Sequence, residues 1–178
     1  MTEEVLAACI AGKRLAQKQF YDFFKGKMYV VCLRYSNSRE DAEDILQEGF
    51  VTVFRDLHQY SGAGHLEGWV RKVFVNVALQ HLQKQKKRMA TVELNDLDLA
   101  VQEESFVIPP DESIAKQMIR ILQQMPDGFR TIFNLYVLEG YTHPEIADIM
   151  GISVGTSKSQ LLRAKAYMRK MLDKSLMT

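Results

Sequence analysis

The spacing of the apolar residues constrains the fold of this chain more than any other feature. One stripe runs from Ala42 through Ile45, Leu46, Gly49, Phe50, Val53, Phe54 and Leu57, and a second through Leu66, Trp69, Val70, Val73, Phe74, Val77 and Ala78. Steps of three and four place such residues on one face of a helix, because an α-helix turns every 3.6 residues. All four prolines, which break helices, lie at or after Pro109. The sequence therefore predicts an all-α fold.

The first half of the chain is expected to form four helices. Two of them are predicted over 5–24 and 28–35, before the two stripes. Ser38 is suited to cap the third helix, because its hydroxyl can accept from the free N–H groups of the first turn. Residues 58–65 separate the third helix from the fourth and have the composition of a loop.

The character of the chain changes after Arg88. Residues 91–113 contain no lysine or arginine but seven acidic residues, and the helical periodicity fades there. We interpret 90–113 as an acidic linker between two small domains, 1–89 and 114–178. A chain of 178 residues with 47% hydrophobic residues can supply two small cores.

Four short helices are predicted after the linker. Asp127 is expected to cap the second, whose inner face would comprise Phe129, Ile132, Phe133, Tyr136 and Val137. The inner stripe of the last helix would comprise Val154, Ser157, Leu161, Ala164, Met168 and Leu172.

Residues 142–170 have the pattern of a helix-turn-helix. Thr142-His143-Pro144-Glu145 is a capping box, in which Thr142 accepts from the N–H of Glu145 and the glutamate reaches back. Gly151 suits the end of the first helix, and Ser153 can cap the second. The outward face of the second helix lacks acids and carries Lys158, Ser159, Gln160, Leu162, Arg163, Lys165 and Arg169. Such a helix can lie in the major groove of DNA, although a basic face is also ordinary surface in many helical hairpins.

Composition limits the other functions. The formal net charge is +1, so a nucleic-acid surface must arise from local sorting of charge. Cys9 and Cys32 lie on apolar stripes outside any metal-ligand pattern, which predicts buried free thiols in a reducing compartment. Acids stand where a basic leader would lie, and no apolar run could cross a bilayer, so we expect a cytoplasmic protein. No group of residues predicts an enzyme active site, a metal site or a cofactor site.

Segments 125–130, 136–147, 151–159 and 163–165 form one set of motifs, and 41–50 with 69–76 form another. The first set resembles the promoter-binding domain of extracytoplasmic-function (ECF) RNA polymerase sigma factors. The second resembles the N-terminal domain of the same family. The resemblance covers nearly the whole chain except the linker. It implies a factor that binds core RNA polymerase and directs it to promoter DNA without performing chemistry, and a partner anti-sigma factor that is often membrane-anchored.

The resemblance also implies a surface that docks on the clamp of the largest polymerase subunit. The residues concerned are Asp41, Glu43, Asp44, Gln47 and Glu48. Without the resemblance, these side chains would be interpreted as caps and solvating charges of a surface helix.

A second implied surface contacts the minus-10 element. Loop 58–65 corresponds to the family's specificity loop, where an unstacked base could meet Tyr60 and Ser61. The following helix would add Arg71, Lys72, Asn76, Lys84, Lys87 and Arg88, and Trp69 is expected in the core. A solvated run of charge is the alternative for each of these basic residues.

A third implied surface contacts the minus-35 element. Lys158, Ser159, Leu162 and Arg163 align with base-contacting positions, and Thr156 and Lys165 with phosphate contacts. Two residues depart from the family pattern. Ser157 stands where an apolar or β-branched residue is common, and Gln160 where arginine is common, so the preferred promoter sequence is open.

Two other functions compete with the sigma-factor hypothesis. A free-standing helix-turn-helix regulator would bind DNA unaided, but it has no use for the motif at 41–50. A helical enzyme would need a convergent set of titratable groups. The acidic linker is expected, by resemblance, to follow the RNA exit channel of the polymerase; a soluble spacer is the alternative.

Overall fold

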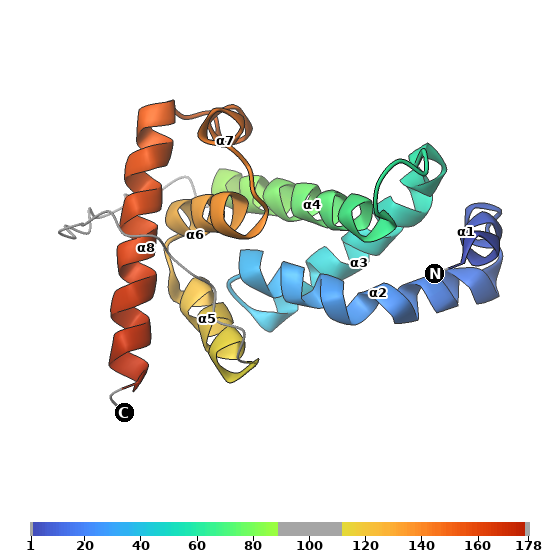
Figure 1. Cartoon of the computed structure of the whole chain (residues 1–178), viewed down its shortest axis with the longest axis horizontal. Coiled ribbons are helices and arrows are strands. Elements are labelled where there is room, and N and C mark those ends of the chain that lie inside the picture. The colour runs from blue at the N-terminus through green and yellow to red at the C-terminus, as the bar shows by residue number, and fades with distance from the viewer. Residues whose placement is uncertain (1, 89–111, 177–178) are drawn as a thin grey trace. The chain divides into compact units, whose positions relative to one another are not determined.

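The computed structural model describes residues 2–88 and 112–176, and every regular element in these ranges is helical (Figure 1). The all-α prediction is therefore confirmed. The chain divides into two compact units, Met1–Ala90 and Thr91–Thr178. The acidic linker predicted over 90–113 lies almost wholly outside the described residues.

The N-terminal unit is built on three long helices. These are α2 (Arg14–Tyr35), α3 (Arg39–Asp56) and α4 (Leu66–Arg88), which all contact one another, while the short α1 (Glu3–Ile10) packs on α2. A 3₁₀ turn, Leu57–Gln59, extends α3 toward the loop. Ser38 caps α3 as predicted, with its Oγ accepting from the N–H of Asp41 at 3.0 Å.

The first two helices break at a different place from the one predicted. The chain turns at Gly12, where φ is +76°, and α2 then continues without interruption through Gly26. A positive φ strains any residue with a Cβ, which explains why the break falls on a glycine. Phe20, Phe24 and Met28 form one buried stripe across the expected break, so packing holds this segment helical.

The core of the N-terminal unit depends on a close approach between α3 and α4. A Cβ built on Gly49 would lie 2.2 Å from the ring of Phe74, closer than two carbon atoms can approach. The same Phe74 ring meets Phe50 edge to face, with centroids 5.2 Å apart. Gly49 therefore lets an aromatic ring from α4 pack directly against the backbone of α3.

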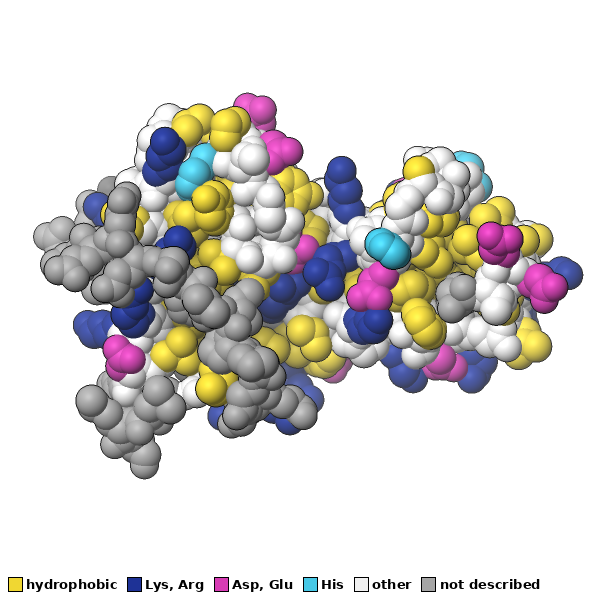
Figure 2. All heavy atoms as spheres, viewed as in Figure 1, with side chains coloured by type: hydrophobic (Ala, Val, Ile, Leu, Met, Phe, Trp, Pro, Cys, Tyr) yellow, Lys and Arg dark blue, Asp and Glu magenta, His cyan; other side chains and the backbone are white. Residues whose placement is uncertain are grey.

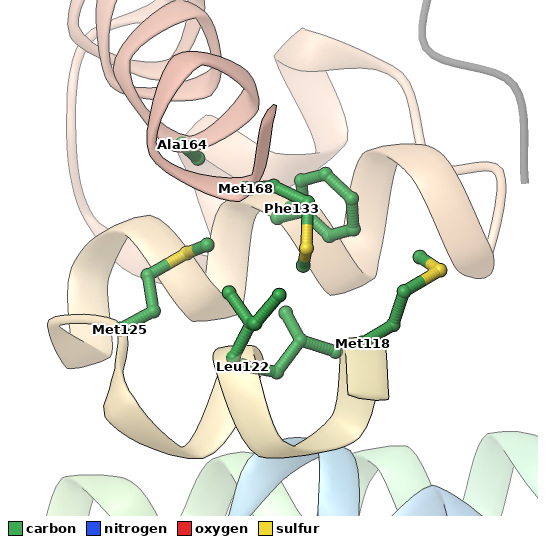
Figure 3. Close-up of a cluster of buried hydrophobic side chains, with 7 residues drawn as sticks. Met118, Leu122, Met125, Phe133, Ala164 and Met168 are labelled. Carbon is green, nitrogen blue, oxygen red and sulfur yellow. The ribbon is translucent and has the colours of Figure 1, made fainter. Parts of the chain in front are cut away.

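In the C-terminal unit the other helices pack against one long helix. That helix is α8 (Val154–Leu176), and its partners are α5 (Glu112–Gln124), α6 (Asp127–Phe133) and α7 (His143–Met150). Figure 3 shows the core that α5, α6 and α8 share, in which three methionines surround Leu122 and Phe133. Flexible methionine side chains suit the irregular space between short helices that cross at several angles.

A π turn, Asn134–Leu138, follows α6 and corrects one prediction. The N–H of Glu139 donates to the carbonyl of Asn134, five residues earlier, at 3.0 Å. The extra residue per turn rotates later side chains off the α-helical stripe. Tyr136, predicted to face inward, is therefore 38% exposed.

Arg130 and Asp127 provide a second correction. Asp127 is the first residue of α6 and makes no capping bond to the backbone. Its carboxylate instead binds the guanidinium of Arg130, which is fully buried. The same guanidinium donates to the carbonyls of Leu122 and Gln123 at 3.5 and 3.4 Å, so it links α6 to the last turn of α5.

Cys9 and Cys32 are buried free thiols, as predicted. Burial raises the pKa of Cys32 to about 12, so this side chain stays protonated and unreactive. In the parts of the chain that the structure describes, no helix combines the length and apolar character needed to span a membrane.

Candidate nucleic-acid interface

The helix-turn-helix is formed by α7 and α8. Its capping box is present in both directions, and the Glu145 carboxylate accepts from the N–H of Thr142 at 2.7 Å. Gly151 ends α7 in the left-handed conformation, with φ at +65°. Ser153 then caps α8 by accepting from the N–H of Thr156 at 3.0 Å. These local bonds set the angle at which the second helix leaves the turn.

The residues predicted to contact the minus-35 element lie on the exposed and half-buried sides of α8. Lys158 and Ser159 are exposed, whereas Thr156, Leu162, Arg163 and Lys165 are half-buried. The Thr156 hydroxyl lies 2.8 Å from the Ser153 hydroxyl, and Ser159 donates to the carbonyl of Thr156 at 3.1 Å. The opposite side of the helix is in the core, where Ser157, Leu161, Ala164 and Met168 are buried.

Two residues of α8 lie differently from the sequence prediction. Val154 was placed on the inner stripe but is 39% exposed, because it begins the helix beyond the edge of the core. Gln160 was placed on the outward face but is half-buried, and its side-chain oxygen lies 3.4 Å from the Cβ position of Gly128 in α6. The outward side of α8 therefore gains the apolar Val154 and loses part of Gln160.

A pocket opens where α7 begins, next to the first turns of α8. It has a volume of about 540 Å³, and its lining includes Tyr136, Tyr141, His143, Pro144, Val154 and Lys158. Figure 2 shows apolar and basic side chains gathered side by side on the surface of this unit. The pocket was not predicted from the sequence. The π turn brings Tyr136 to it, and the spacing of the apolar residues does not indicate a π turn.

The His143 ring at this pocket is held from two sides. Its Nδ1 lies 2.9 Å from the Ser157 hydroxyl, and its face stacks on Tyr136 with centroids 4.5 Å apart. Lys165 Nζ lies 5.8 Å from the centroid of the Tyr136 ring. Desolvation, together with the charges of Lys158 and Lys165, lowers the pKa of His143 below its ordinary value. The ring is thus neutral at neutral pH.

In the N-terminal unit the candidate specificity loop closes on itself. The Tyr60 hydroxyl donates to the carbonyl of Gly64 at 2.8 Å, and Gly62 and Gly64 both have positive φ. The Tyr60 ring lies 5.9 Å from that of Trp69, which is half-buried rather than in the core as predicted. Ser61 is exposed next to this turn. Tyr60 therefore shapes the loop that presents Ser61.

The candidate minus-10 residues of α4 differ in their surroundings. Lys72 and Asn76 are exposed and four residues apart, so they share one face of the helix. Arg71 lies 3.9 Å from Glu67, whose carboxylate also binds Lys27 from α2. The hydrogen bond from Lys27 and the charge of that lysine, with a smaller effect from the charge of Arg71, lower the pKa of Glu67. The side chains of Lys87 and Arg88 lie outside the described residues.

The candidate polymerase-binding residues of α3 fall into two groups. Glu43, Asp44 and Gln47 are exposed. Asp41 and Glu48 instead meet α4, where Gln85 donates to Asp41 at 3.1 Å and Lys84 lies 3.2 Å from Glu48. His81 is 3.6 Å from the same oxygen of Asp41. These contacts join residues about 40 positions apart, so no local pattern in the sequence predicts them.

No group of His, Cys, Asp and Glu side chains within 2–88 and 112–176 is arranged to hold a metal ion. The candidate surfaces in these two ranges carry charged side chains, hydroxyl groups and aromatic rings. Such groups bind phosphates and bases directly.

Comparison with known proteins identifies both units. Residues 20–88 match the family description "Sigma-70 region 2", and residues 115–168 match "Sigma-70, region 4". Together these two matches cover more than half of the chain. Each match contains one of the helix sets described above, the first α3 and α4, the second α7 and most of α8.

Similar proteins cover almost the full length. The RNA polymerase sigma-H factor of Pseudomonas aeruginosa is 26% identical over 162 residues, which is 86% of this chain and 82% of that protein. The ECF sigma-E factor of Haemophilus influenzae is 25% identical, with 93% and 92% covered, and SigW of Bacillus subtilis is 25% identical, with 90% and 91% covered.

Solved structures share the fold. The sigma factor RpoE of Bartonella quintana, determined in complex with the anti-sigma factor NepR, has a TM-score of 0.52 at 17% identity and covers 88% of this chain and 96% of that one. CnrH, determined with the cytosolic domain of CnrY, has a TM-score of 0.50 at 17% identity, with 96% of both chains covered. The two region matches and the full-length relatives establish that this chain belongs to the ECF type of RNA polymerase sigma factors.

Proposed function

We propose that this sigma factor directs RNA polymerase through three separate surfaces. Domain 114–178 would contact the minus-35 element, domain 1–89 would contact the minus-10 element and the polymerase, and 90–113 would connect them. The observation that carries the proposal is the pairing of a capped helix-turn-helix in one unit with an exposed acidic face on α3 in the other. A regulator acting alone would need only the first.

The proposed minus-35 surface is the outward side of α8. Lys158, Ser159, Leu162 and Arg163 would meet base edges, because an exposed helix face with long basic side chains fits the major groove. Thr156 and Lys165 would contact phosphates on either side of that face. Removing a base contact should weaken binding at one base pair, whereas removing a phosphate contact should weaken binding to every sequence.

The proposed minus-10 surface combines the loop after α3 with the outward face of α4. Tyr60 would hold the loop in shape and Ser61 would meet an unstacked base. Lys72 and Asn76 would contact the strand directly. Arg71 would first have to leave Glu67, and Lys84 would have to leave Glu48, since both are paired in the free protein. Lys87 and Arg88 would add charge at the end of the helix.

The proposed polymerase surface is centred on Glu43, Asp44 and Gln47. These side chains are exposed and adjacent on α3. Asp41 and Glu48 would border the same surface while they hold α4. Charged groups on such a rim accelerate and orient association more than they add affinity.

The proposed partners are core RNA polymerase, promoter DNA and an anti-sigma factor. RpoE of Bartonella quintana and CnrH were both determined with a partner chain, NepR or CnrY, which supports the last of these. The family is not known as an enzyme family, and we propose that this protein likewise acts by binding rather than by chemistry. Its place of action would be the cytoplasm, where the polymerase works.

Run-off transcription with purified core polymerase tests the function directly. The templates are fragments of the source genome, and the expected result is a set of new transcripts that share an upstream and a downstream element. Arg163→Ala should reduce these transcripts, because they depend on the shared upstream element that α8 is proposed to contact. Lys170→Ala is the matched control, since it removes an exposed positive charge from the same helix outside the assigned residues. Specific binding of DNA without polymerase, and no new transcripts, would favour a free-standing regulator.

A further inference from the structure

Ser157 is a polar residue at a place in α8 where the helix faces the core. It is fully buried, and the residues in the same stripe, Leu161, Ala164 and Met168, are apolar. A buried hydroxyl needs a hydrogen-bond partner, because leaving it unpaired would cost more than the bond contributes. His143, the first residue of α7, supplies one, with Nδ1 at 2.9 Å from the hydroxyl. The contact between the two helices is therefore directional here, not merely apolar.

The His143 ring is itself fixed by a third element. Tyr136 in the π turn stacks on it with an interplanar angle of 26°. Lys165, two turns further along α8 than Ser157, lies over the Tyr136 ring. The π turn, α7 and α8 thus meet in one set of contacts, which we call the His143 cluster (Tyr136, His143, Ser157 and Lys165).

The position of Ser157 in α8 connects the His143 cluster to the proposed base-contacting face. Ser157 immediately precedes Lys158 and Ser159, which are exposed and begin the proposed base-contacting face. Lys158 also lines the same pocket as His143 and Tyr136. Hydrogen bonds to base edges weaken steeply with small errors of distance and angle. A bond that fixes Ser157 therefore also fixes where its two neighbours meet DNA.

We propose that His143 is a positioning residue for promoter recognition, which acts through Ser157 to fix the first turns of α8 against the minus-35 element. The inference rests on the proposed assignment of that element to α8. His143 does not need to touch a base for this role. Its removal should lower the discrimination between promoter sequences more than it lowers the amount of folded protein.

The test uses the complete holoenzyme and two promoter fragments that differ in one base pair of the minus-35 element. The measured quantity is the ratio of their affinities. His143→Phe keeps a ring to stack on Tyr136 but removes Nδ1, and Ser157→Ala removes the hydroxyl. His143→Asn keeps a polar atom near the place of Nδ1 and serves as the conservative variant. Hydrogen exchange of α8 amides, measured on each protein, reports the folding of the unit.

His143→Phe and Ser157→Ala should each lower the affinity ratio about fivefold, as expected for one hydrogen bond. The double variant should lower it no further, because both changes remove the same bond. His143→Asn should retain most of the ratio. Effects that multiply in the double variant, or a loss that Asn does not restore, would overturn the proposal.

The same experiment separates this proposal from the one on which it rests. A wild-type holoenzyme that discriminates between the fragments, with variants that discriminate equally well, would refute the role of His143 alone. A wild-type holoenzyme that transcribes both fragments but ignores the changed base pair would refute the assignment of α8, and the role of His143 with it.

Discussion

Gly49 and Gly26 show how differently one residue type can act in two helices of the same unit. An added methyl group at Gly49 would collide with the Phe74 ring, whereas at Gly26 it would meet open space. Gly49→Ala should therefore lower the free energy of unfolding by about 1–3 kcal/mol through overpacking. Gly26→Ala should raise it by about 0.5–1 kcal/mol, because alanine favours the helix.

Urea unfolding followed by the fluorescence of Trp69 measures both changes. Trp69 is the only tryptophan in the chain and belongs to the N-terminal unit, so its signal is specific to that unit. Equal effects of the two substitutions would show that α3 and α4 do not approach each other as closely as the structure indicates.

Because the pKa of His143 is lowered, we expect the stability of the C-terminal unit to depend on pH. This pKa is lowered in the folded protein, so as pH falls through the ordinary histidine range the unfolded chain takes up a proton that the folded chain resists. The free energy of unfolding should therefore decrease between about pH 7.5 and pH 5.5. Hydrogen exchange of α8 amides at the two pH values should show this loss in the wild type and a smaller loss in His143→Asn. A loss of equal size in both proteins would assign the effect to other groups.

At the scale of elements, the junction between α5 and α6 rests on one buried cation. Arg130 pairs with Asp127 and donates to two carbonyls at the end of α5. Arg130→Met fills most of the volume but leaves these acceptors without their donor. It should lower the free energy of unfolding of this unit by about 3 kcal/mol. Arg120→Met, an exposed arginine of α5, is the control and should change it by less than about 0.5 kcal/mol. Circular dichroism during urea unfolding measures both.

The sequence predicted the starts and ends of helices better than their packing. Ser38, Ser153 and the capping box at Thr142 were recognised because each cap is a bond between neighbours in the chain. The break between the first two helices was placed between residues 24 and 28 instead of at Gly12, since a glycine lies near both places and only the buried stripe decides between them. A capping bond is local information, whereas the choice between two glycines depends on the tertiary core.

In the candidate surfaces, too, local features could be predicted from the sequence and tertiary contacts could not. The exposure of Lys158, Ser159, Lys72 and Asn76 follows from helical spacing, which the sequence contains. The pairing of Asp41 and Glu48 with α4 could not be predicted, because their partners come from a helix about 40 residues away. Tyr136 was misplaced because the prediction continued α-helical spacing through 134–138, where the structure has a π turn.

At the scale of the whole molecule, the two proposed promoter contacts should reinforce each other through the proposed linker. Two sites on one chain raise each other's effective concentration, which falls with roughly the −3/2 power of the linker length. Inserting a flexible segment that makes residues 90–113 about three times longer should therefore weaken binding to a two-element promoter about fivefold. The holoenzyme's affinity for a promoter that keeps only the minus-10 element is the control and should not change. If the proteins with the normal and the lengthened linker bound the two-element promoter with equal affinity, the two domains would bind independently of the linker.

The π turn after α6 also determines where this unit can lose a residue. A π turn holds one residue more than an α turn, so deleting one residue from 134–138 would leave an ordinary helix and keep the later segments in register. The same deletion in the middle of α8 would rotate everything beyond it by about 100° and turn Met168 out of the core. Length variation among chains of this type should therefore accumulate at the π turn and be absent from α8.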